Sequence, residues 1–225
     1  PVIVRPKPTA EFTSNITEGC SPVCIDFESL STSNATSIIN SQWTYGNGTS
    51  SNQPNNNRCF VNDDNVNDIT FDVQLIVTND FGCKDTMFVA DYVSVYHNPV
   101  AEFSASPQQT NMYQTEVQFT NTSIGADAYD WNLGDGTFSI DFEPIHSYLD
   151  TGVYEVVLNV TTINGCTDYT SLDVTIYPII SLYVPNAFTP DGDGVNDMFM
   201  FEGYGITEKD LEFMIFDRWG DMIYY

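Results

Sequence analysis

The sequence predicts an all-β chain that folds as two β-sandwiches in tandem, followed by a partial C-terminal β-sandwich. Along residues 154–161 apolar and polar side chains alternate with the period of two that suits a strand with one buried face. Turn signals such as residues 134–136, 150–152 and 164–165 recur about every ten residues, and no stretch keeps a helical period. A long internal repeat is the third observation.

The repeat relates residues 71–78 and 82–83 to residues 154–161 and 165–166 at one constant offset of 83. Further upstream, residues 43–48 match 131–136, and residues 10–12 match 101–103. Such self-similarity indicates two copies of one domain. The offset falls from 91 to 88 to 83, which places the insertions of the first copy in loops.

The elements divide into four parts. Residues 1–9 are expected to be the end of a preceding domain or a linker, with residues 2–4 as its last strand. Residues 10–97 and 98–178 form the two copies, with seven strands expected in each, and residues 179–225 begin a different domain. The linkers at residues 96–99 and 177–178 are short and contain proline, which restricts the backbone, so we expect an elongated rod that solution scattering can measure.

The composition excludes several kinds of partner. Six Lys and Arg stand against 31 Asp and Glu, and the net charge of −25 repels nucleic acid and anionic lipid and attracts divalent cations. The acidic residues are scattered among strand formers, which indicates solvated strand faces; adaptation of the surface to salt is the other reading. No apolar run approaches the roughly 20 residues of a membrane helix. The first residues lack the features of a signal peptide, so we expect a piece of a longer secreted precursor.

Five cysteines are present without any C-x-x-C pair, which argues against zinc and thioredoxin-type chemistry. Disulfides formed outside the cytoplasm fit this pattern better. Because the count is odd, at least one thiol is expected to stay free or to pair with another chain.

Three segments of the second copy, residues 131–136 (WNLGDG), 146–148 (HSY) and 152–156 (GVYEV), resemble the PKD domain. The resemblance covers about residues 10–178 and implies Ig-like sandwiches that serve as spacers or adhesive modules in bacterial surface proteins and secreted hydrolases. The first copy departs from the pattern, with Asn47 where the family usually has Asp and no clear G-x-Y before Phe71. Asp135 is interpreted as a turn residue and not as a ligand, because Asp-Gly is a common turn pair. Trp43 and Trp131 are expected to fill the cores, with a sugar-stacking platform as the minor alternative.

The resemblance also suggests disulfides. PKD-like domains of this bacterial type often join the positions of Cys20 and Cys83, so these two are assigned to each other. Cys24 and Cys59 would lie on adjacent strands of one sheet, where Cβ atoms come close enough to bridge. Cys166 is then left unpaired, because Met112 occupies its partner's place in the second copy.

The last segment carries two long motifs, residues 184–197 (VPNAFTPDGDGVND) and 215–224 (IFDRWGDMIY). They resemble the start of the gliding-motility-associated C-terminal domain, the type B sorting domain of the Bacteroidetes type IX secretion system, as found in large gliding adhesins. The resemblance implies export through the type IX outer-membrane channel with its shuttle and attachment proteins, to the cell surface or the medium. The residues assigned to this sorting signal are Pro185, Asn186, Phe188, Pro190, Arg218, Trp219 and Gly220.

A possible metal site lies inside the first motif. Asp191, Asp193, Asn196 and Asp197 are separated by glycines, so that a tight loop could direct several oxygens at one Ca²⁺ ion. The alternative is a turn rich in Asp and Asn with no metal. The sequence argues against a full EF-hand, because Val195 and Asn196 stand where a ligand and a glycine are needed.

The inventory for catalysis is thin. His97 lies in a linker and His146 in a strand that the PKD family shares, and no nucleophile elbow, zinc motif or phosphate loop occurs. We therefore expect no enzyme, but a structural and targeting region of a surface protein that aids gliding or adhesion. The alternative is a module that binds glycan or protein for a secreted hydrolase, with surface polysaccharide as a partner. Exposed tryptophans would favour that alternative, and buried ones the spacer.

Overall fold

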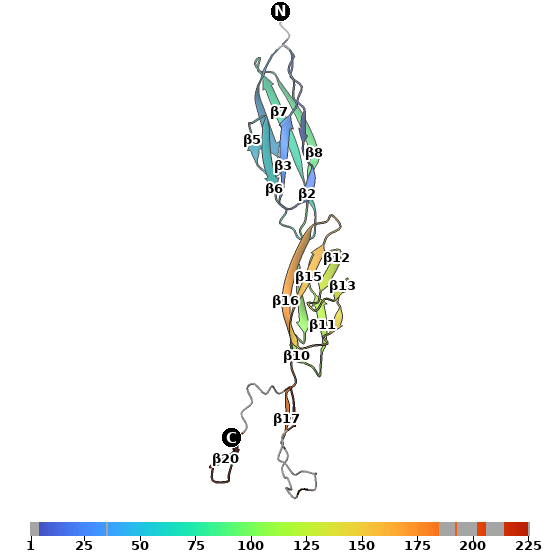
Figure 1. The fold of residues 1–225 in the computed structure, drawn as a ribbon. Coiled ribbons are helices and arrows are strands. Elements are labelled where there is room, and N and C mark those ends of the chain that lie inside the picture. The colour runs from blue at the N-terminus through green and yellow to red at the C-terminus, as the bar shows by residue number, and fades with distance from the viewer. Residues whose placement is uncertain (1–4, 35, 185–191, 193–201, 206–213, 225) are drawn as a thin grey trace, which may run out of the picture. The chain divides into compact units, whose positions relative to one another are not determined.

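The computed structural model describes residues 5–34, 36–184, 192, 202–205 and 214–224. Every regular element in these ranges is a β-strand, so the predicted all-β fold is confirmed (Figure 1). No helix of the described residues is long and apolar enough to cross a membrane.

The first sandwich consists of a three-stranded sheet of order β1-β3-β6 and a five-stranded sheet of order β2-β8-β7-β4-β5. Strand β2 pairs with β8 in parallel, and the other pairs are antiparallel. The strands are β1 (Phe12–Ser14), β2 (Glu18–Cys20), β3 (Val23–Ser29), β4 (Ile38–Tyr45), β5 (Ser50–Ser51), β6 (Asn55–Phe60), β7 (Ile69–Asn79) and β8 (Lys84–Tyr96).

The second sandwich has the same plan, with sheets of order β14-β11-β9 and β10-β16-β15-β12-β13 and a parallel pair between β10 and β16. Each copy thus holds eight strands and not the predicted seven, because β5 and β13 are two-residue edge strands too short to show a period. The strands are β9 (Phe103–Ser106), β10 (Gln109–Asn111), β11 (Glu116–Asn121), β12 (Ala128–Asn132), β13 (Phe138–Ser139), β14 (Ile145–Ser147), β15 (Gly152–Thr161) and β16 (Thr167–Tyr177).

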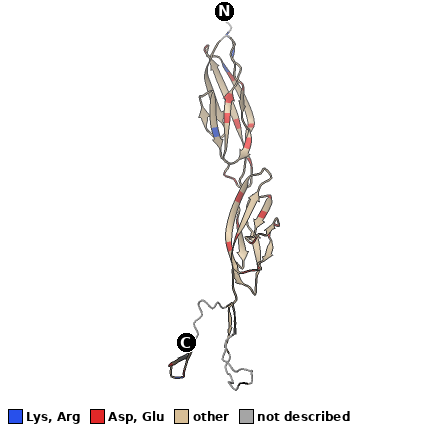
Figure 2. Ribbon diagram, in the orientation of Figure 1, with Lys and Arg blue, Asp and Glu red and all other residues tan. Residues whose placement is uncertain are grey.

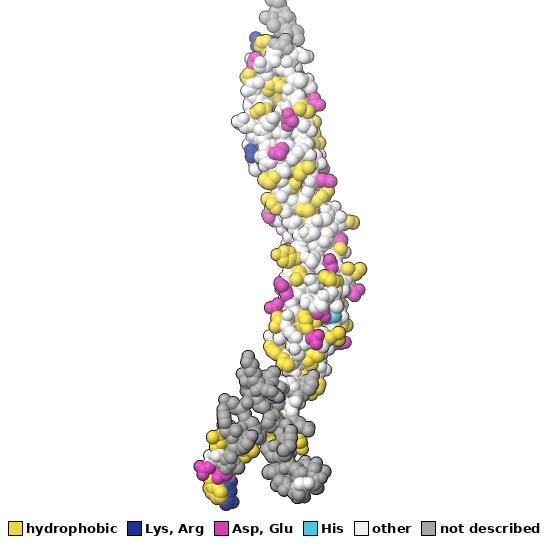
Figure 3. Space-filling view, viewed as in Figure 1, with side chains coloured by type: hydrophobic (Ala, Val, Ile, Leu, Met, Phe, Trp, Pro, Cys, Tyr) yellow, Lys and Arg dark blue, Asp and Glu magenta, His cyan; other side chains and the backbone are white. Residues whose placement is uncertain are grey.

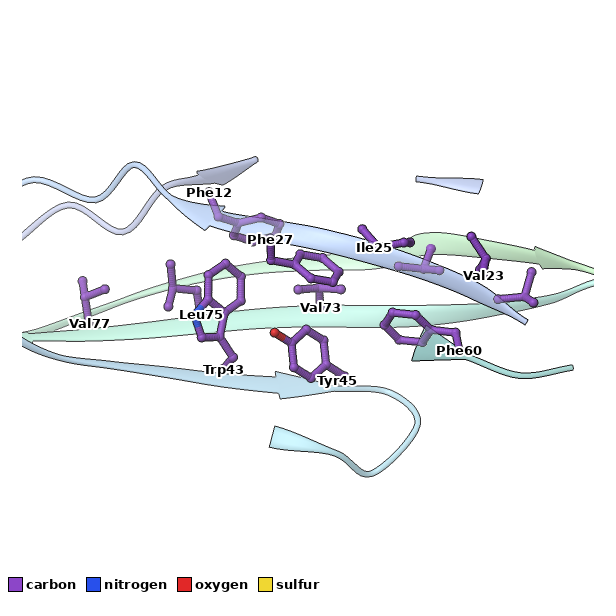
Figure 4. Packing of buried hydrophobic residues seen from close by; sticks show 12 residues of the cluster. Phe12, Val23, Ile25, Phe27, Trp43, Tyr45, Phe60, Val73, Leu75 and Val77 are labelled. Atoms are coloured by element: carbon purple, nitrogen blue, oxygen red, sulfur yellow. The ribbon is translucent and has the colours of Figure 1, made fainter. Parts of the chain in front are cut away.

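The core of the first sandwich lies between its two sheets (Figure 4). Burial along β3 alternates strictly, so that Val23, Ile25 and Phe27 point inward, as the period of two predicts. From the other sheet Trp43 packs edge-on against the ring of Phe12, with their centroids 5.2 Å apart. Aromatic pairs of this geometry add to the stabilisation that burial gives.

Beyond the second sandwich the described residues form two short ladders. Strand β17 (Ser181–Tyr183) pairs with β18 (Glu202–Tyr204), and β19 (Ile215–Phe216) pairs with β20 (Met222–Tyr224). Figure 2 shows Asp and Glu spread over the strands of both sandwiches, as expected of solvated strand faces.

Contacts gather the chain into two compact units. The first comprises residues 1–104, 119–144 and 156–172, and the second comprises residues 105–118, 145–155 and 173–225. The first unit therefore contains the whole first sandwich together with the strands and turns of the second that carry Cys166.

Candidate functional site

Several predicted site residues lie outside the described part of the chain. These are the proposed calcium ligands Asp191, Asp193, Asn196 and Asp197 and the signal residues Pro185, Asn186, Phe188 and Pro190. The calcium prediction and the roles of these four signal residues stay predictions. Within the described ranges, no group of three or more His, Cys, Asp or Glu side chains could hold a metal ion.

The other three signal residues lie in the turn between β19 and β20. The Asp217 carboxylate holds this turn by accepting the backbone N–H groups of Trp219 at 2.8 Å and Asp221 at 2.9 Å. Gly220 takes a φ of +93°, which a residue with a side chain rarely adopts, and its N–H donates to the Asp217 carbonyl at 3.1 Å. Asp217 was not among the predicted residues, although an aspartate two residues before a tryptophan-glycine pair is a turn signal.

This turn presents Arg218 and Trp219 together. The guanidinium of Arg218 lies 4.0 Å from the centre of the Trp219 ring, within the range of a cation–π interaction. Trp219 is 73% exposed, in contrast to the two tryptophans of the sandwiches. An exposed, preorganised Arg-Trp pair is suited to contact with another protein.

The structure contradicts the predicted bridge between Cys20 and Cys83. Cys20 instead forms a disulfide with Cys166, with Cα atoms 5.6 Å apart, and Cys83 is free. The prediction that Cys166 is unpaired was therefore also wrong. The bridge joins the two copies of the repeat and lies within the first compact unit.

The length of β8 prevents a bond between Cys20 and Cys83. Cys20 ends β2 and lies beside Tyr96, at the C-terminal end of β8. Cys83 directly precedes Lys84, at the opposite end of the same 13-residue strand. At about 3.3 Å per residue this strand separates the two cysteines by roughly 40 Å, far beyond the reach of a disulfide.

The second bridge agrees with the prediction. Cys24 on β3 and Cys59 on β6 are direct partners in an antiparallel register, and the structure joins them by a disulfide. The resemblance to the PKD domain supplied the two strands, and their adjacency in one sheet brings the Cβ atoms within reach of a bridge.

Polar contacts also join residues of the two copies. Asp68 accepts hydrogen bonds from the backbone N–H of His97 at 3.0 Å and from Nδ2 of Asn164 at 2.8 Å. The Nδ1 atom of His97 lies 2.6 Å from the Asp68 carboxylate, and its Nε2 lies 3.1 Å from the carbonyl oxygen of Gly125. Because both ring nitrogens face acceptors, the doubly protonated imidazolium can donate to both. Sequence reasoning placed His97 in the linker but did not find Asp68 or Asn164, which lie far from it in the chain.

We expect the pKa of His97 to be raised and to fall in the Asp68→Asn variant. Burial lowers this pKa, but the hydrogen bonds to Asp68 and Gly125 and the negative charges of Asp68 and Asp127 outweigh it, so the pKa lies above its ordinary value of 6.5. The pKa of Asp68 is lowered: burial opposes this, and the hydrogen bonds from His97 and Asn164 prevail.

The signs of these shifts define a pH window for stability. The raised pKa of His97 stabilises the fold fully below the unfolded value, and this contribution disappears as the pH rises through the folded one. The Asp68 contribution disappears as the pH falls through its own lowered pKa. Titration of the His97 ring by NMR checks the prediction, with Glu116→Gln, at an exposed position on β11, as control. An unchanged His97 titration in Asp68→Asn would contradict it.

Three residues of the PKD-like motifs for which a ligand-binding role was the alternative, Trp43, Trp131 and Asp135, make structural contacts. Trp43 and Trp131 are fully buried, and their indole N–H groups donate to the carbonyls of Gln53 and Asp141, both at 2.9 Å. The Asp135 carboxylate accepts from the N–H of Thr137 at 3.0 Å, and Asn47 makes the same contact to Thr49 at 3.1 Å. Asn47 thus replaces Asp in the turn of the first copy without loss of its hydrogen bonds.

Comparisons with known proteins agree with this geometry. A family model of the PKD domain matches residues 96–176, and a model described as the CHU_C Type IX secretion signal domain matches residues 182–225. No match was found among curated proteins.

Three solved structures are similar to parts of the chain. The PKD1 domain of the Vibrio cholerae metalloprotease PrtV is 29% identical, over 35% of this chain and 96% of that domain, with a TM-score of 0.31. The PKD1 domain of Vibrio anguillarum Epp is 28% identical, over 37% and 98%, with a TM-score of 0.32. The fibronectin(III)-like modules of Clostridium thermocellum CbhA are 11% identical, over 75% and 95%, with a TM-score of 0.34.

Proposed function

We infer that the chain is part of a protein exported across the outer membrane to the cell surface or the medium, because a match to the PKD domain model is followed by a match to the type IX secretion signal domain model. Both domains are non-catalytic modules, and the signal domain implies interaction with the type IX machinery. We propose that the chain is the C-terminal region of a Bacteroidetes gliding or adhesion protein. Its sandwiches act as spacers, and its last segment directs export.

The observation that carries this proposal is the match of the secretion signal model to residues 182–225. The exposed Arg218 and Trp219 supply a surface with which the machinery can interact. A turn held by one carboxylate keeps this pair in place before binding, which reduces the entropy lost on recognition.

The spacer role is supported by where the aromatic residues lie. Both sandwich tryptophans are buried, as a spacer requires, whereas a sugar-stacking platform needs them exposed. In the view of Figure 3 the exposed hydrophobic side chains of the sandwiches occur in small groups separated by polar surface. Two disulfides suit a module that works outside the cell, where reductants are scarce.

Calcium binding by Asp191, Asp193, Asn196 and Asp197 is a further part of the proposal. The support for it is the spacing of the carboxylates and the net charge of −25. Carboxylates this close in sequence repel one another, and a divalent cation offsets that repulsion.

A second candidate function is binding of surface polysaccharide on behalf of a secreted hydrolase. The observation in its favour is a polar hollow on the sheet that contains β1, β3 and β6. Asn15, Asp26, Asn56 and Asn57 are among its lining residues. Amides and carboxylates of this kind can hydrogen-bond to sugar hydroxyls.

In the full-length protein, we expect removal of residues 182–225 to abolish surface display, and Trp219→Ala to reduce it severalfold. The matched control is Tyr169→Ala, which removes another aromatic residue, 71% exposed, from outside the signal. Antibody labelling of intact cells, with and without the type IX channel, measures the effect. Display that depends on neither the channel nor the signal would refute the proposal and leave the spacer and binding roles.

A further inference from the structure

The free cysteine, Cys83, lies in a turn that is built like the turn of the bridged Cys166. In the first copy the N–H of Asn79 donates to the Cys83 carbonyl at 3.0 Å, and in the second that of Thr162 donates to the Cys166 carbonyl at 2.9 Å. Gly82 and Gly165 take φ angles of +75° and +82°. The same local structure therefore presents both cysteines.

Side chains hold the two cysteines in the same way. The backbone N–H of Cys83 donates to Oδ1 of Asn79 at 3.0 Å, and that of Cys166 donates to Oγ1 of Thr162 at 3.1 Å. Asparagine and threonine differ in shape, but both supply the acceptor that orients the cysteine.

The equivalence extends to the segment that precedes the first strand of each sandwich. Asp85 accepts the backbone N–H of Ala10 at 2.8 Å, and Asp168 accepts that of Ala101 at 2.9 Å. An antiparallel bridge joins Thr9 to Thr32 in the first copy and Val100 to Ile124 in the second. Corresponding ends of the two sandwiches thus have the same hydrogen bonds and bridges; the first end carries Cys83 and the second carries Cys166.

The two ends differ in what covers the cysteine. Cys166 is 2% exposed and bonded to Cys20, the last residue of β2 in the preceding copy. Cys83 is partly exposed, and its thiol is free. Next to it Phe81 is 43% exposed, whereas its equivalent, Asn164, contacts Asp68 of the preceding copy.

We propose that Cys83 forms a disulfide with a cysteine of a further sandwich that precedes this one in the full-length protein. The partner lies at the end of a strand equivalent to β2, so that the preceding sandwich is bonded to the first by the same kind of bridge that joins the first to the second. The equivalent bond of Cys166 to Cys20 is the independent observation that points to this partner. The inference requires the oxidising export route and does not depend on an adhesive role.

The bond forms by thiol–disulfide exchange with an oxidised dithiol protein of the periplasm. The Cys83 thiolate attacks the donor disulfide and displaces one of its sulfurs as a thiolate. The partner cysteine, as thiolate, then attacks the mixed disulfide at the Cys83 sulfur and releases the second donor thiol. Two cysteine thiols are thereby oxidised, the donor disulfide is reduced to a dithiol, and both protons remain with the donor thiols or solvent.

Peptide mapping of the full-length protein from the cell surface tests the proposal. Free thiols are blocked with N-ethylmaleimide, and the unreduced protein is cleaved at aspartate. Cleavage at Asp80 and Asp85 isolates Cys83 from the other cysteines. We expect the Cys83 peptide to be linked to a peptide from upstream of residue 1, with the Cys20–Cys166 link in the same digest as internal control.

A Cys83→Ser variant of the full-length protein gives a second readout. If the bond exists, the variant gains one thiol that reacts with N-ethylmaleimide in the folded protein, and that thiol maps upstream of residue 1. Three results would overturn the inference. The first is a Cys83 modified by N-ethylmaleimide in the native protein, and the second is a link of Cys83 to Cys20 or to a second copy of Cys83. The third is the absence of a new reactive thiol in the variant. Each of these outcomes leaves the proposed export function untouched.

Discussion

Replacing both Cys20 and Cys166 by alanine is expected to give the largest loss of stability of any change to the cysteines. The bridge spans 146 residues of sequence. A disulfide that closes a loop of this length restricts the unfolded chain by about 5 kcal/mol in the chain-entropy model. Both copies lie largely inside the loop closed by this disulfide, so we expect its removal to lower the free energy of unfolding of both sandwiches.

Unfolding in guanidinium chloride, followed by far-UV circular dichroism, measures this loss. The control is Cys83→Ala, which removes a thiol that forms no bond in this chain and is expected to change stability by less than about 0.5 kcal/mol. Equal unfolding midpoints for the double variant and the control would show that the bridge between the copies contributes nothing.

Trp43→Ala and Trp131→Ala are each expected to destabilise their own sandwich by about 3–5 kcal/mol. Both side chains are fully buried, so truncation leaves a large cavity. Each indole N–H also donates to a loop carbonyl, Gln53 or Asp141, and that acceptor loses its partner. The loss of the hydrogen bond adds to the cost of the cavity.

Trp219→Ala is the matched control, because it deletes the same side chain from a position that is 73% exposed. We expect its unfolding curve to coincide with that of the parent chain. Trp43→Phe distinguishes packing from hydrogen bonding, since it keeps most of the buried area and removes only the donor. A Trp43→Ala variant as stable as Trp219→Ala would contradict the assignment of Trp43 to the core.

Local patterns determined much of this protein. The alternation along Val23, Ile25 and Phe27 sets which face of β3 is buried, because successive side chains of a strand point to opposite sides. The turns at Asn47 and Asp135 follow from side chains that bond their own backbone two residues on. The sorting motif could be identified for a different reason: it is a contiguous stretch of sequence, so it can be compared with a known family without the tertiary structure.

Only the tertiary structure decided the partners of Cys20 and of His97. The resemblance to the PKD domain assigned Cys20 and Cys83 to each other. In the structure they lie beside opposite ends of β8, and the length of that strand excludes their bond. The bond of Cys20 to Cys166 joins two domains, and the alternation of apolar and polar residues along single strands does not predict such a contact. Asp68, His97 and Asn164 likewise come together from distant positions. Local backbone chemistry thus determined the strands and turns, whereas pairs separated by 146 residues arise only when the domains pack.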